Sequence, residues 1–190
     1  MPYRTQELIS FDPRSIFLLL KGHISKEDAY RLVDEVWESN PRSEGGSTLS
    51  IDRSHPFNPV EFIGRGWSII EQNERSLAIT EVELAKVSLV TMLKNYDNGR
   101  VHGEEKLHRL KASGHIRLDA KIFQTFWENK DRIPEIWRGK CVYFDGTVLQ
   151  SPSGCRYVLY LDWRGDEWDW HYYWLESDWG DSSPSAVLAE

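Results

Sequence analysis

The sequence predicts an α+β fold with an N-terminal β-α-β segment, central helices and a C-terminal four-stranded antiparallel β-meander. Apolar residues recur at helical spacing in residues 25–39, 103–112 and 119–129, whereas strand-like runs separated by turn residues fill 141–175. Hydrophobic residues make up 40% and charged residues 28% of the 190-residue chain, which is enough apolar material for a packed core. We therefore expect one α+β domain over residues 1–190, or two sub-lobes at 1–55 and 56–190.

The N-terminal β-α-β segment is predicted from residues 15–51. Residues 15–21 form an apolar run of strand length. Ser25 and Asp28 resemble a capping box, and they begin an amphipathic helix that ends near residue 39. After a glycine-containing loop, residues 48–51 complete the unit as a second strand.

Residues 53–99 are predicted to form short elements, because prolines interrupt the start of this stretch. We expect a helical turn at 60–63, strands at 67–70, 79–84 and 87–93, and a turn at 97–99.

Two helices follow in the centre of the chain. The first spans residues 103–112, with Gly114 as the residue that ends it. Asp119 caps the second, whose apolar residues recur at helical spacing and form its buried face: Ile122, Phe123, Phe126 and Trp127. Pro134 begins one further helical turn, which runs to Trp137.

Four strands are predicted in the last third, separated by three turns. The strands are 141–144, 147–150, 155–163 and 168–175. The first turn, Asp145-Gly146, is among the strongest sequence signals for a two-residue hairpin.

The turn lengths set the register of this meander. They place Trp163 opposite Trp168, Asp162 opposite Asp169, and Tyr160 opposite His171. They also place Gln150 opposite Cys155, and Tyr143 and Val148 on the sheet face that carries Leu159. Cys141 and Cys155 are separated by one strand, at ~10 Å, so we expect two free thiols.

One face of the predicted meander is rich in Trp and Tyr. This face either packs as core beneath the helix that carries Phe123, or forms a stacking platform for a sugar, base or peptide with Trp179 at its rim.

The charge of the chain is concentrated in one segment. The formal net charge is −7, and residues 160–181 contain seven acids, a single base (Arg164) and five of the nine tryptophans. Carboxylates attract a basic partner and aromatic side chains supply contact energy. Our first hypothesis is a soluble, cytoplasmic, non-catalytic protein that binds a basic protein, as inhibitors and immunity-type proteins do. Its partner-binding residues are Asp162, Asp166, Glu167, Asp169, His171, Asp178 and Trp179.

The second hypothesis is a metal-dependent or hydrolytic enzyme centred on Asp162, Asp169 and His171. Two facing carboxylates are unfavourable without a cation between them, and a neighbouring imidazole suits acid–base or metal chemistry. The sequence contains no H-E-x-x-H, C-x-x-C, G-x-S-x-G or phosphate-loop motif. We therefore expect no catalytic residue, metal or cofactor.

The third hypothesis rests on residues 100–140, which carry ten bases and six acids. Two helices followed by a hairpin resemble, in element order, a winged-helix DNA-binding module. The resemblance implies phosphate contacts by Lys106, Arg109, Lys121 and Lys130. Because the wing would enter the most acidic segment, which repels phosphate, we expect nucleic acid not to be the partner. No run approaches the ~20 apolar residues of a membrane span, so we expect no membrane partner. The oligomeric state is left open.

Overall fold

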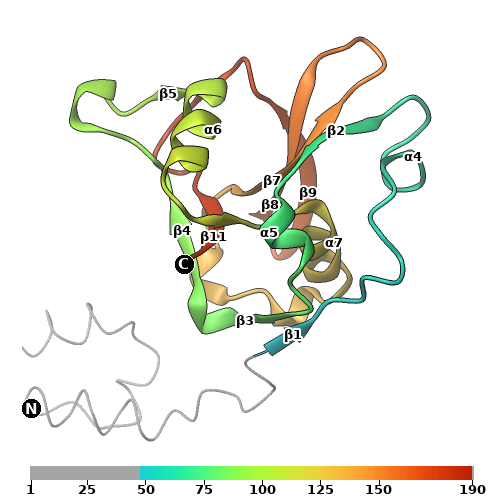
Figure 1. The fold of residues 1–190 in the computed structure, drawn as a ribbon. Coiled ribbons are helices and arrows are strands. Elements are labelled where there is room, and N and C mark those ends of the chain that lie inside the picture. The colour runs from blue at the N-terminus through green and yellow to red at the C-terminus, as the bar shows by residue number, and fades with distance from the viewer. Residues whose placement is uncertain (1–47, 190) are drawn as a thin grey trace, which may run out of the picture. The chain divides into compact units, whose positions relative to one another are not determined.

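A computed structural model describes residues 48–189, and the chain divides after residue 46 (Figure 1). The strand predicted at 15–21 and the helix predicted at 25–39 lie outside the described residues. The described helices and strands are β1 (Thr48–Ser50), α4 (Pro59–Phe62), β2 (Ser68–Gln72), α5 (Glu74–Leu77), β3 (Glu81–Glu83), β4 (Val87–Val90), β5 (Val101–His102), α6 (Gly103–Ala112), β6 (Ile116–Arg117), α7 (Ala120–Glu128), β7 (Val142–Gln150), β8 (Arg156–Arg164), β9 (Glu167–Trp174), β10 (Asp178–Trp179) and β11 (Ser185–Leu188). Single 3-10 turns lie at Leu84–Lys86, Asn95–Asp97, Lys130–Arg132 and Glu135–Trp137.

The main sheet is mixed but mostly antiparallel, which confirms the α+β class. Its path runs β4-β11-β7-β8-β9, with β2 also paired to β7 and β6 to β11. Only the β11–β7 pairing is parallel among the described strands. Two further strand pairs, β1–β3 and β5–β10, stand apart from it. None of the helices within residues 48–189 is long and apolar enough to cross a membrane.

The two central helices begin and end where the sequence predicts. Helix α6 spans Gly103–Ala112, and Gly114 follows it with φ of 78°. The side chain of Asp119 accepts hydrogen bonds from the backbone N–H groups of Lys121 and Ile122, and so caps α7. Local spacing and capping are therefore enough to define both helices.

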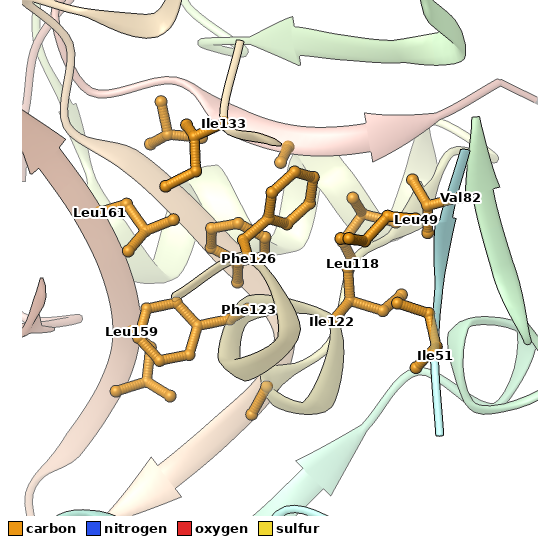
Figure 2. Close-up of a cluster of buried hydrophobic side chains, with 14 of the residues drawn as sticks. Leu49, Ile51, Val82, Leu118, Ile122, Phe123, Phe126, Ile133, Leu159 and Leu161 are labelled. Atoms are coloured by element: carbon orange, nitrogen blue, oxygen red, sulfur yellow. The ribbon is translucent and has the colours of Figure 1, made fainter. Parts of the chain in front are cut away.

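The larger core lies around α7. Figure 2 shows Phe123 and Phe126 turned toward the strand that carries Leu159 and Leu161. On the other side of the helix, Ile122 lies beside Ile51, and Leu118 lies near Leu49 and Val82. The central part of the aromatic face packs into the same cluster, with Trp168 buried and Trp163 and Trp170 partly buried. Trp127 of α7 also packs against this cluster. This part of the face is core, as the first of the two interpretations predicts.

A second core lies on the opposite face of the sheet, beneath α6. Its buried residues are Val101, Leu107, Tyr143, Val148, Val158, Tyr160, Leu175 and Trp179. Tyr143 and Trp179 pack with their ring centroids 4.0 Å apart. The two cores lie on opposite faces of the same sheet, so its central strands are buried on both faces.

The predicted Asp145-Gly146 hairpin does not form. Both halves belong to the single strand β7, and the register shifts between Phe144 and Leu149. The Gly146 N–H donates to Leu118 O, and its carbonyl accepts from the Asn73 N–H. A Cβ at Gly146 would clash with the backbone oxygen of Arg117. Glycine is needed here because two backbones cross closely, and not because the chain turns.

Because the hairpin is absent, several residues lie on a different sheet face or pair with a different residue than predicted. Tyr143 pairs with Tyr160 and therefore lies on the second core, opposite to the face of Leu159. Val148 moves with Tyr143 to the second core. Gln150 pairs with Arg156 instead of with Cys155.

The β8–β9 hairpin has the predicted register throughout. Trp163 pairs with Trp168, Asp162 with Asp169, and Tyr160 with His171. Both cysteines are free, as expected.

Candidate functional site

Strand β9 forms one edge of the sheet, and β8 is its only strand partner among residues 48–189. Because β9 spans eight residues, its two ends lie ~24 Å apart. The acidic segment is therefore divided between these ends. Asp166 and Glu167 are exposed at the hairpin with β8, and Glu176 and Asp178 are exposed beyond the other end.

At the hairpin end, the positive charge of Arg164 reduces the repulsion between the facing carboxylates of Asp162 and Asp169. The guanidinium Nε of Arg164 donates to Asp162 Oδ2 at 2.6 Å. This bond raises the pKa of Arg164. Asp162 is 8% exposed, and its second oxygen, Oδ1, is buried without a hydrogen-bond partner.

His171 lies between the two carboxylates. Its Nε2 is 3.2 Å from Asp169 Oδ2 and 3.9 Å from Asp162 Oδ1, so the protonated ring would pair with both. The structure thus brings together the three residues of the enzyme hypothesis. However, no group of three or more His, Cys, Asp or Glu side chains in the described part of the chain is arranged to hold a metal ion.

Neighbouring groups at this end are held in their neutral forms. Burial raises the pKa of the Cys141 thiol, and the charge of Asp162 raises it further. Burial and the same carboxylate also raise the pKa of Tyr160. Cys141 is therefore poorly suited to act as a nucleophile, because the thiolate is the reactive form.

The other end of β9 carries exposed aromatic side chains. Tyr172, Tyr173 and Trp174 are 43%, 36% and 38% exposed. Trp67 packs against one side of them, with its ring centroid 4.7 Å from that of Tyr172. Tyr172 and Trp174 continue the aromatic face, which is core at its centre and accessible at this end. Tyr173 lies on the opposite face, where its ring contacts those of Tyr143 and Trp179. The platform interpretation therefore applies to Tyr172 and Trp174 alone.

Trp179 does not lie on the rim of that surface. It is 1% exposed and packs between Tyr143 and the Lys106 ammonium, whose Nζ is 4.3 Å from the Trp179 ring centroid. Trp179 is therefore a residue of the second core. Glu176 and Asp178, close to Trp179 in the chain, are exposed.

The basic residues named for nucleic-acid binding are mostly enclosed. Lys106 is fully buried, its Nζ donates to Ser183 O at 2.7 Å, and desolvation lowers its pKa to about 8. Arg109 is buried and donates to Glu105, Asp97 and the Met92 carbonyl. Neither side chain is placed to contact a phosphate.

The remaining two bases of this set are also bound into the fold or poorly exposed. Lys130 donates to Trp168 O at 3.0 Å and lies 3.6 Å from the centroid of the Trp127 ring. Lys121 is 9% exposed and lines a depression of about 250 Å³ with His55 and Glu61. The four residues do not form a common exposed basic surface.

Sequence patterns did not single out Glu176 or Tyr173, and they placed Tyr172 and Trp174 on the aromatic face without separating them from its buried part. Glu176 lies in the acidic segment 160–181, but composition alone does not distinguish it from the other acids of that segment. Strand alternation alone could not separate the buried from the exposed end of one aromatic row, because that depends on where α7 stops covering the sheet. The chain matches no protein-family model, no curated protein and no solved structure.

Proposed function

We propose that this protein is a non-catalytic binding protein that captures a basic protein partner along strand β9. One observation carries the proposal. Asp166, Glu167, Glu176 and Asp178, termed here the β9 acids, are exposed and have no ion-pair partner among residues 48–189.

Charge and contact area support the same kind of partner. Four uncompensated carboxylates at the two ends of one strand attract a positive surface and align it along that strand. Tyr172, Tyr173 and Trp174 lie between them and offer the aromatic contact area that dominates binding energy in protein interfaces.

Asp162 adds negative charge near the hairpin end of β9. It is 8% exposed and its Oδ2 accepts from Arg164, so it contributes to the field of this surface and not a direct contact with the partner.

The test is capture of partners from the native lysate by tagged protein, compared between matched charge-reversal variants. Asp166→Lys/Glu176→Lys changes both ends of β9. Glu61→Lys/Glu81→Lys makes the same change in net charge at exposed acids elsewhere. We expect a basic protein to bind wild type and the control pair, to be released as salt screens the attraction, and to be lost with the β9 pair. Equal retention by the β9 pair would overturn the proposal.

A further inference from the structure

The open edge of β9 is defined by the direction of its backbone groups. Leu175 N–H donates to Arg156 O, so the odd-numbered residues of β9 pair with β8 and the even-numbered residues point away from it. Two side-chain contacts agree. Lys130 Nζ donates to Trp168 O, and the Trp170 N–H donates to Asp169 Oδ1.

These same two contacts protect only the first half of the edge. Exposed strand edges are normally blocked by charged side chains, bulges or covering elements, because free N–H and C=O groups invite another strand. Trp168 O and Trp170 N are occupied in this way. The Trp174 carbonyl accepts from Ser177 N–H in the turn that ends β9.

Four consecutive outward groups remain between these points: Trp170 O, Tyr172 N–H, Tyr172 O and Trp174 N–H. None of them has a partner in the described part of the chain. These groups come from alternate residues of β9, which is the pattern of hydrogen-bonding groups that an edge strand offers to an added parallel or antiparallel strand.

The charges decide what kind of strand fits. A segment longer than the five residues that face 170–174 would run on toward both ends of β9, where the β9 acids lie. A second copy pairing antiparallel about Tyr172 would bring the hairpin end of one β9 to the opposite end of the other. Asp166 and Glu167 of one chain would then lie near Glu176 and Asp178 of the other, and like charges held close together are unfavourable. A segment with lysine or arginine on both flanks meets carboxylates at both ends instead.

We infer that β9 binds an extended, lysine- or arginine-flanked segment of a protein partner as an added strand, hydrogen-bonded to residues 170–174. This inference rests on the proposed function and specifies how the basic partner is held. Main-chain bonds would supply part of the affinity, and the flanking charges and the exposed aromatic side chains would supply register and specificity.

The first test uses two synthetic peptides of equal charge. One has a central Val-Thr-Val-Thr-Val flanked by two lysines on each side. The other is identical except for N-methyl groups on alternate central residues, on the edge that would face β9. We expect at least tenfold weaker binding of the methylated peptide, and at least tenfold slower amide exchange at Tyr172 and Trp174 when the unmodified peptide is bound. Equal affinity of the two peptides would overturn strand addition.

The second test removes one donor from the protein. Tyr172→Pro deletes an N–H that points away from β8, and proline is tolerated at such edge positions. Tyr172→Ala removes the ring but keeps the N–H. We expect only the proline variant to bind the unmodified and methylated peptides equally weakly. If that variant does not fold, the peptide pair on wild type still decides the question.

The outcomes separate this inference from the proposed function. Salt-sensitive capture that is lost with Asp166→Lys/Glu176→Lys, but with no exchange protection by peptide at Tyr172, would overturn strand addition and leave the proposed function standing. Protection at Tyr172 that rises with protein concentration in the absence of peptide would identify a second copy as the occupant and overturn the inference. If the peptide bound tightly and Asp166→Lys/Glu176→Lys left its affinity unchanged, the β9 acids would not recognise the lysine flanks. That result would overturn the inference that the bound segment has basic flanks.

Discussion

Two charged regions on the same sheet differ in whether their charges are paired. Around Glu71, three cations converge on one carboxylate: Lys111 Nζ at 2.7 Å, Arg117 Nη1 at 3.3 Å and Arg156 Nη2 at 3.5 Å. Arg156 also pairs with Glu104 at 2.6 Å. Along β9, by contrast, the β9 acids have no cation among residues 48–189.

The difference shows how one chain divides its charged residues between structure and surface. The bases of residues 100–140 are largely used inside the fold, in the pairs around Glu71 and in the buried contacts of Lys106 and Arg109. The acids of residues 160–181 have few bases left to pair with. Removing one partner of a buried ion pair leaves an uncompensated charge and destabilises the fold, whereas exposed unpaired charges contribute little to stability and remain available to a partner.

The largest expected effect is at Asp119, the acid with the most buried side chain among the ion pairs of residues 48–189. Asp119 accepts from Arg53, from Ser76 Oγ at 2.6 Å and from two backbone N–H groups of α7. We expect Asp119→Ala to lower the free energy of unfolding by about 3–5 kcal/mol, because Arg53 loses its counter-charge and α7 its cap. Urea denaturation measures this. Asp166→Ala is the matched control, and equal losses for the two variants would remove the contrast between paired and unpaired acids.

A smaller effect is expected at Glu71, which is partly exposed. Burial opposes its ionised form, but hydrogen bonds and charge from Lys111 and Arg117 outweigh burial and lower its pKa. We expect Glu71→Gln to cost about 2 kcal/mol at pH 7. The folded-state pKa lies below the unfolded value, so this contribution is present above the unfolded pKa and is lost as the pH falls through the folded one. Unfolding curves of wild type and variant should therefore converge on acidification, and a constant difference would contradict the ion-pair origin.

The buried amine of Lys106 predicts a further rise of stability with pH, in the alkaline range. Its folded-state pKa is lowered to about 8 by desolvation, against 10.5 unfolded, so the unfolded chain binds more protons between these values. Stability should rise by about 1 kcal/mol from pH 8 to pH 9. Denaturation of wild type beside Lys106→Met checks this, since the variant lacks the titrating group and should show no such rise. A flat wild-type profile would mean that folding does not lower the pKa of this amine.

The smallest stability effect is expected on β9 itself. Glu176→Gln and Asp178→Asn remove unpaired exposed charges, so the free energy of unfolding should change by less than about 0.5 kcal/mol. Capture of a basic partner should nevertheless weaken. A loss of stability comparable to that of Glu71→Gln would show that these acids have structural partners after all.

Local signals in the sequence determined the helices and the β8–β9 hairpin. The bounds of α6 and the cap of α7 follow from apolar spacing, Gly114 and Asp119. The pairing of Asp162 with Asp169 follows from the length of one turn. The segment 160–181 was also recognised from composition alone, because seven acids among five tryptophans are unusual in a solvated tail.

Only the tertiary structure decided which of these residues are accessible. Gly146 serves a close backbone crossing instead of a turn, because the segment at Leu118 packs directly against β7. Strand β11, which was not predicted, enters between β4 and β7, because a short apolar run of four residues at 185–188 shows no local sign of its partners. The burial of Lys106 and Trp179, and the exposure of Tyr172–Trp174, depend on where α6 and α7 cover the sheet. Contacts between residues far apart in the chain set that cover, and local spacing carries no record of them.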